Sequence, residues 1–147
     1  MDYVTKAEEL FVEGYNCAQA VALAFSDKTG LDKETTLKIA SSFGGGFGRL
    51  REVCGAVSGM CMVAGLLYGY DDISDKAAKM NHYALVQELA GKFSEEAGSI
   101  VCRELLGRKG KENPMPEDRT KEYYKTRPCA RMVGLAAKIM QEYIENN

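Results

Sequence analysis

Hydrophobic residues recur every three or four positions along most of the chain, which is the spacing that places side chains on one face of an α-helix. No stretch alternates between apolar and polar residues as a half-buried β-strand does. The pattern predicts helices over residues 2–13, 17–26, 33–42, about 51–68, about 75–98, 100–106 and 117–125, and a last one that opens at Pro128. We therefore predict an all-α fold, with roughly six to eight helices in a single domain over residues 1–147.

Turn and capping residues agree with these boundaries. Gly14 follows the first helix, and Asn16 and Asp32 are good N-caps for the second and third, because their side chains accept hydrogen bonds from free backbone N–H groups. Residues 107–116 are polar, rich in glycine and proline, and show no helical pattern. We expect an exposed loop there.

Residues 53–70 form the central segment of the prediction, since these 18 residues include no charged side chain. They contain four glycines, a serine and two tyrosines, which favours a buried core helix over a membrane-spanning one. A glycine-rich loop, residues 44–48, precedes them and permits backbone conformations with positive φ. Gly55 and Gly59 lie four residues apart, so they leave a flat groove where another helix can approach closely.

Composition and charge narrow the functional classes. The net charge is −2 with both signs mixed along the chain, so no basic face indicates a nucleic-acid partner. The first residues are acidic and amphipathic and do not resemble a signal peptide, which predicts a cytoplasmic protein. Five cysteines in a reducing compartment are more often redox-active, metal-binding or simply buried than part of a disulfide framework.

Four of the five cysteines share one setting, within about the first turn of a predicted helix. They are Cys17, Cys54, Cys102 and Cys129. A helix N-terminus offers free N–H groups and a partial positive charge, which favour the thiolate over the thiol. Nearby basic residues would add to this effect; they are Arg51, Arg103, Arg127 and Arg131. The competing interpretation is that these cysteines are inert core residues.

The remaining candidates carry less chemistry. Cys61 lies seven residues after Cys54 on the same helix face, and we expect it to be a buried core residue, with a resolving thiol for Cys54 as the alternative. His82 is the only histidine, which argues against a histidine-rich metal site or a Cys–His–Asp triad. The glycine-rich loop lacks the lysine and the preceding strand of phosphate-binding loops.

Taken together, these motifs resemble the C-GCAxxG-C-C family of small redox-active proteins. The resemblance rests on Cys17 within residues 15–20, the triple glycine 44–46, the block 54–59 that reads Cys-Gly-Ala-Val-Ser-Gly, and then Cys102 and Cys129. It covers nearly the whole chain. It implies that these four cysteines are the family's signature, with Cys61 outside it, and it implies a redox role and an association with transporters. The family is similar to part of the split-Soret cytochromes, but this chain lacks the Cys-x-x-Cys-His of covalent haem.

Three hypotheses follow. In the first, the protein is a thiol/disulfide oxidoreductase whose helix starts converge near Cys54, with Cys54 the most activated thiolate and Cys17, Cys102 or Cys129 its disulfide partner. In the second, the same four thiolates bind a metal ion or an iron–sulfur cluster. In the third, the protein is a non-enzymatic helical module, a homo-oligomer or a transporter accessory, and the cysteines belong to its core.

Overall fold

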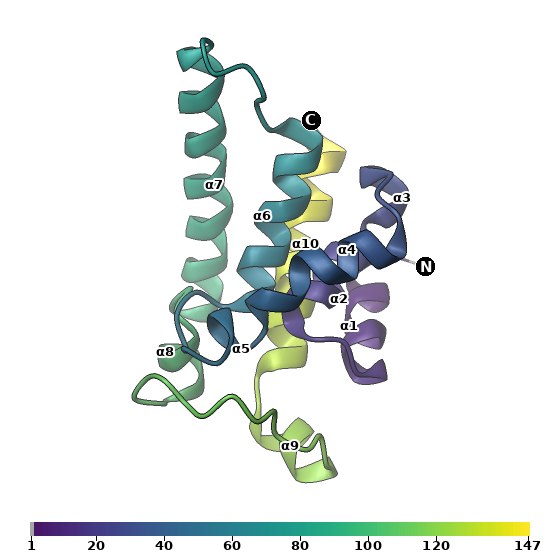
Figure 1. Cartoon of the computed structure of the whole chain (residues 1–147), viewed down its shortest axis with the longest axis vertical. Coiled ribbons are helices and arrows are strands. Elements are labelled where there is room, and N and C mark those ends of the chain that lie inside the picture. The colour runs from purple at the N-terminus through teal and green to yellow at the C-terminus, as the bar shows by residue number, and fades with distance from the viewer. Residues whose placement is uncertain (1) are drawn as a thin grey trace.

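The structure, a computed structural model, describes residues 2–147, with the side chains of all but residues 125 and 126. Helices make up most of this part of the chain, and it contains no β-strand beyond one isolated bridge. The three longest lie against one another, namely α6 (Gly55–Tyr68), α7 (Lys76–Ala97) and α10 (Cys129–Asn146) (Figure 1). On the other side of α6 and α10 lie α1 (Tyr3–Glu13), α2 (Cys17–Ala24) and α4 (Lys33–Ala40). The prediction of an all-α fold is confirmed.

The short elements gather at one end of this bundle or connect its long helices. They are α3 (Ser26–Thr29), a 3-10 turn (Ser41–Phe43), α5 (Gly44–Phe47), α8 (Cys102–Leu106) and α9 (Lys121–Thr126). Figure 1 shows α5, α8 and α9 at the end where α6 and α10 begin. Three of the four signature cysteines open an element there or nearby, so this end of the molecule contains the candidate chemistry.

Side-chain caps fix where α1, α2, α4 and α7 start. Asp2, Asn16, Asp32 and Asp75 each accept a hydrogen bond from the backbone N–H three residues further on. At α2 the cap is reciprocal, because the Gln19 side chain also accepts from the backbone N–H of Asn16. The predicted caps at Asn16 and Asp32 are confirmed, and the first of them holds Cys17 at the first position of α2.

The hydrophobic core surrounds α6, as the uncharged segment predicts. Val57, Met60 and Val63 on this helix are buried, and they share one cluster with Phe93 of α7 and Met140 of α10. In the described part of the chain, no helix is both long enough and apolar enough to cross a membrane. Because Val57, Met60 and Val63 lie in this cluster, the interpretation of the uncharged segment as a core helix is confirmed for Gly55–Tyr68.

The start of this central helix differs from the sequence prediction. We expected it near Arg51, but α6 begins at Gly55, and residues 51–54 lie outside the helix. Arg51 has φ of 58°, and its left-handed backbone conformation prevents the helix from extending back to it. The residues after Arg51 pair with the segment before α8 through an antiparallel bridge between Val53 and Val101. Periodicity along one segment does not reveal such a partner, because the partner is distant in sequence.

Candidate functional site

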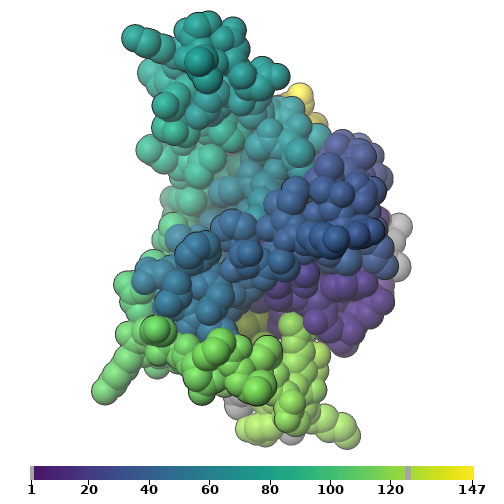
Figure 2. Space-filling model, in the orientation of Figure 1, coloured from purple at the N-terminus to yellow at the C-terminus, as the bar shows by residue number. Residues whose placement is uncertain are grey.

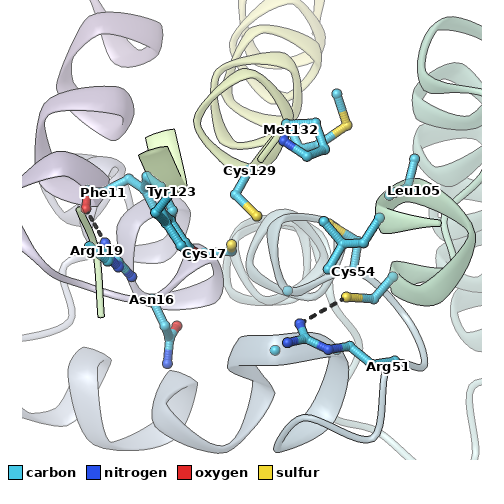
Figure 3. A pocket seen from close by; sticks show the side chains of 16 residues that line it. Phe11, Asn16, Cys17, Arg51, Cys54, Leu105, Arg119, Tyr123, Cys129 and Met132 are labelled. Carbon is cyan, nitrogen blue, oxygen red and sulfur yellow. Dashed lines mark hydrogen bonds between the residues drawn. The ribbon is translucent and has the colours of Figure 1, made fainter. Parts of the chain in front are cut away.

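The four signature cysteines line a single small cavity, which we call the cysteine cavity. Cys17, Cys102 and Cys129 are the first residues of α2, α8 and α10, and Cys54 is the N-cap of α6. The cavity has a volume of about 80 Å³, which accommodates a few water molecules but no sizeable organic ligand. Figure 3 shows the side chains of Cys17, Cys54 and Cys129 approaching from different helices. The expected convergence of distant helix starts near Cys54 is therefore found.

Glycines make this convergence possible. A Cβ atom at Gly55 would lie 3.2 Å from the Cβ of Cys17 and 2.8 Å from the carbonyl oxygen of Phe43. A Cβ atom at Gly59 would lie 2.7 Å from the carbonyl oxygen of Ala18, so α2 passes directly over both glycines. The predicted groove between Gly55 and Gly59 is confirmed, and the helix that occupies it contributes Cys17.

The glycine-rich loop gives the same kind of access to Cys102. A Cβ atom at Gly46 would lie 2.6 Å from the Cβ of Cys102 and 2.9 Å from the Cα of Arg51. Gly46 also has φ of 67°, a conformation that side chains disfavour. The loop therefore serves geometry, because it lets α8 and Arg51 press against its backbone.

Backbone hydrogen bonds place Cys54 and Cys102 in two neighbouring segments that run antiparallel. The N–H of Cys54 donates to the carbonyl oxygen of Ile100 at 2.7 Å, and the N–H of Cys102 donates to that of Glu52 at 2.5 Å. These bonds flank the bridge between Val53 and Val101. The positions of both cysteines are thus set by main-chain hydrogen bonds rather than by side-chain packing alone.

Burial keeps the thiol of Cys54 protonated. Burial raises the pKa of its thiol to about 12, although the N–H groups of Ala56 and Val57 at the start of α6 act in the opposite direction. Only 6% of the residue is exposed. The expectation that Cys54 is the most activated thiolate is therefore wrong, because desolvation outweighs the field of the helix N-terminus.

Cys17 and Cys129 form the close pair in the cavity. Their side chains are hydrogen-bonded to one another, and the hydrogen bond from Cys17 is the main reason that the pKa of Cys129 falls to about 6. Burial opposes this ionisation, while the charge of Arg127 and a hydrogen bond from Tyr123 support it. The pKa of Cys17 is raised, first by that same hydrogen bond and then by burial. These opposite shifts favour a thiolate at Cys129 beside a protonated Cys17.

Cys102 contacts a buried arginine. Arg51 is 4% exposed, and its Nη1 donates to the Sγ of Cys102 at 3.5 Å. Burial raises the pKa of Cys102, and the nearby guanidinium reduces this shift without cancelling it. The Nε of Arg51 donates to Glu112 at 2.7 Å, so the guanidinium contacts both a thiol and a carboxylate.

Glu112 connects the loop of residues 107–116 to this site. Its carboxylate accepts from Arg51 at 2.7 Å, from Arg108 at 2.7 Å and from Arg49 at 3.1 Å. Burial raises the pKa of Glu112, but the hydrogen bonds and charges of Arg108 and Arg51 outweigh it and lower the pKa overall. The loop carries no helix, as predicted, yet this carboxylate binds it to Arg49 and Arg51, directly after the glycine-rich loop.

Aromatic and basic side chains cover the cavity next to Cys129. The guanidinium of Arg119 lies 4.1 Å from the ring centre of Phe11 and donates to the carbonyl oxygens of Phe11 and Tyr15. That of Arg127 lies 5.2 Å from the ring centre of Tyr123 and forms an ion pair with Glu117. These contacts hold the segment before α10 against the C-terminal end of α1.

Sequence reasoning found some of these groups and missed others. It named Arg51 and Arg127 as basic neighbours of cysteines, and both act on a thiol. Arg103 instead pairs with Glu52, and Arg131 is exposed. It missed the groups contributed by the segment before α10 and by the 107–116 loop: Glu112, Arg119 and Tyr123. No periodic pattern or motif marks these three.

Cys61 and the metal hypothesis are the remaining predictions to place. Cys61 does not line the cysteine cavity, and it is half-buried against the core from α6. All five cysteines have free thiols. Among the residues that the structure describes, no three histidine, cysteine or acidic side chains are placed to hold one metal ion. The catalytic role of the four signature cysteines, the transporter partner and the homo-oligomer stay predictions.

Comparison with known proteins gives one family. A family model described as "Putative redox-active protein (C_GCAxxG_C_C)" matches residues 15–143 and so includes all four cysteines of the cavity. No curated protein and no solved structure matches the chain. Because the match covers most of the sequence, and because the four signature cysteines meet in one cavity, the chain belongs to the C_GCAxxG_C_C family.

Proposed function

We propose that this protein carries out thiol–disulfide exchange, with Cys129 as the attacking thiolate and Cys17 as the resolving thiol. The observation that carries the proposal is the contact between these two side chains, which lowers the pKa of one and raises that of the other. A nucleophilic thiolate beside a protonated thiol is what the two successive steps of exchange require.

The proposed reaction balances without a cofactor. The Cys129 thiolate attacks one sulfur of a substrate disulfide, forms a mixed disulfide and releases the other half as a thiolate, which takes a proton to become a thiol. Cys17 then loses its proton and attacks the Sγ of Cys129, which releases the second half of the substrate as a thiol. The substrate gains two electrons and two protons, and the protein ends with a Cys17–Cys129 disulfide.

Local groups assist the first step. Arg127 and the hydroxyl of Tyr123 stabilise the negative charge on Cys129 before it attacks. Cys54 and Cys102 have raised pKa values and remain thiols at neutral pH, so neither begins the attack. We place the exchange in the cytoplasm, where reductants return such a pair to the dithiol form.

Disulfide mapping tests the proposal directly. The reduced protein is treated with a slight excess of an oxidised small disulfide and then alkylated, digested and analysed by mass spectrometry. We expect two thiols to be lost and one Cys17–Cys129 linkage to appear. In Cys17→Ser, the substrate half should stay attached to Cys129 as a mixed disulfide.

Cys61→Ser serves as the matched control, because it removes a half-buried thiol that does not line the cavity. It should give the same linkage as the wild type. Five thiols that all remain alkylatable after oxidation would refute the proposal, as would a linkage confined to Cys54 and Cys102.

The rival hypothesis of a four-cysteine metal or iron–sulfur site draws its support from the shared cavity. It predicts stoichiometric metal in protein purified without oxygen, with visible absorption for a cluster and loss of metal in each of the four single-cysteine variants. That result would replace the exchange proposal. Unchanged function in a folded variant without all four cysteines would instead support the non-enzymatic module.

A further inference from the structure

A second, larger pocket adjoins the cysteine cavity, and we call it the arginine pocket. It has a volume of about 370 Å³ and lies between the glycine-rich loop and the segment of residues 114–127. Figure 2 shows the green segment that follows residue 107 running along the lower edge of the molecule, beneath the blue segment of the glycine-rich loop. The two cavities share Asn16, Gly45, Arg51, Arg119 and Tyr123 in their walls.

The walls of the arginine pocket carry an excess of positive charge. Four arginines line it, Arg49, Arg51, Arg119 and Arg127, and the acidic side chain among its lining residues is Glu117. Adding the adjacent Arg108 and Glu112 leaves the excess at three positive charges, since these two cancel. A concave site with one sign of charge attracts ligands of the opposite sign.

Existing ion pairs do not remove this excess. Glu112 forms ion pairs with Arg49 and Arg51, and Glu117 forms an ion pair with Arg127. Arg119 donates to the carbonyl oxygens of Phe11 and Tyr15, which are neutral acceptors and leave its charge in place. Arg119 also lines both cavities, so this charge lies between the pocket and the thiols.

We propose that the arginine pocket binds the carboxylate-bearing part of a low-molecular-weight anionic disulfide, and so places its sulfur atoms at the cysteine cavity. This inference rests on the proposed thiol–disulfide exchange and adds the class of substrate. The pocket volume lies in the range of roughly 300–1,000 Å³ that is typical of small-molecule sites. The adjoining cysteine cavity is too small for a ligand of that size and suits only the reacting sulfur.

Two alkylating reagents of nearly the same size separate the two proposals. Iodoacetamide is neutral and iodoacetate is an anion, and both react with thiolates through loss of iodide. The rate constants for Cys129 are measured by mass spectrometry and divided by those of a small reference thiol. We expect the normalised rate constant for iodoacetate to be about ten times that for iodoacetamide, because the positive pocket concentrates the anion. The ratio should fall towards one at high salt.

Two charge variants locate the source of this preference. Arg119→Gln removes the charge that lies between the cavities, and Lys138→Gln removes the same charge from an exposed position on α10. We expect the ratio to drop about threefold in Arg119→Gln, as removal of one of several focused charges implies, and to remain unchanged in Lys138→Gln. Arg119→Lys keeps the charge without the fork of N–H donors and should retain most of the ratio.

Disulfide probes then test the substrate class. The dianion 3,3′-dithiodipropionate and the neutral bis(2-hydroxyethyl) disulfide are compared, each again relative to the reference thiol. We expect the dianion to react about tenfold faster with the protein after this correction.

The outcomes are distinguishable. If Cys129 reacts with iodoacetamide and forms the Cys17–Cys129 disulfide but shows no preference for anions, the substrate class is wrong and the exchange stands. If Cys129 reacts with neither alkylating reagent, the exchange itself is wrong. An anion preference equal in Arg119→Gln and wild type, at low and high salt, would also overturn the assignment to this pocket.

Discussion

Gly55 lies directly beneath Cys17, so closely that a methyl group on it would lie 3.2 Å from the Cβ of that cysteine. The absence of a side chain at Gly55 therefore controls how near α2 approaches the start of α6. The same approach sets the position of Cys17 in the cysteine cavity, which makes a packing residue a determinant of the chemistry.

The first prediction tests this packing. Gly55→Ala and Gly59→Ala should each lower the free energy of unfolding by about 1–3 kcal/mol, because the new methyl groups meet backbone oxygen atoms at less than 3 Å. Urea denaturation followed by circular dichroism measures the change. Gly65→Ala is the matched control on the same helix, since its methyl group would meet nothing within 4 Å. It should be neutral or stabilising by about 0.5–1 kcal/mol, and equal effects at Gly55 and Gly65 would contradict the close approach.

The second prediction concerns the ionisation of Cys129. Its alkylation rate should rise with pH around a midpoint near 6, as its lowered pKa implies, because only the thiolate reacts. Tyr123→Phe removes a hydrogen bond to the thiolate, so the midpoint should move up by about one pH unit. Tyr124→Phe is the control, since that hydroxyl donates to the carbonyl oxygen of Val12 instead. A midpoint near 9 in the wild type would show that Cys129 is an ordinary thiol.

The third prediction concerns Glu112, which holds three arginines. Glu112→Gln should lower the free energy of unfolding by about 2–4 kcal/mol, because it leaves Arg51 buried without its carboxylate. The uncompensated charge should also lower the pKa of Cys102 and speed its alkylation. Glu88→Gln breaks an exposed pair with Lys92 and should cost less than about 0.5 kcal/mol. If Glu112→Gln left both stability and Cys102 reactivity unchanged, the connection through Arg51 would be absent.

The fourth prediction concerns the oxidised protein. A Cys17–Cys129 disulfide closes a loop of roughly 110 residues, so oxidation should raise the free energy of unfolding by about 4 kcal/mol. Urea midpoints with and without reductant measure the difference. Cys17→Ser should show the same midpoint in both conditions, and a wild type that also showed no difference would argue against this pairing.

Much of the fold could be predicted from the sequence because it depends on local signals. Asn16 and Asp32 are recognisable caps, and their helices begin where the caps indicate. Gly55 and Gly59 were expected to admit a neighbouring helix, and they do. Helical spacing and glycine spacing both depend on residues that are close together in the sequence, so they can be interpreted without a tertiary structure.

The ranking of the thiols could not be predicted in the same way. Cys54 and Cys129 both lie at helix starts, yet burial raises the pKa of the first while Cys17 and Arg127 lower that of the second. Burial and long-range contacts depend on how the helices pack. The partners that decide the outcome, such as Tyr123, lie in segments whose pattern gives no indication of chemistry.

The wide separation of Cys17 and Cys129 in the sequence links the reactivity of Cys129 to folding. The low pKa of Cys129 depends on Cys17, Arg127 and Tyr123 being in place, and the unfolded chain lacks these contacts. In an unfolded or newly made chain, Cys129 is therefore an ordinary, slowly reacting thiol. Its raised reactivity arises only once the helices have assembled, so attack by this thiolate is confined to the folded protein.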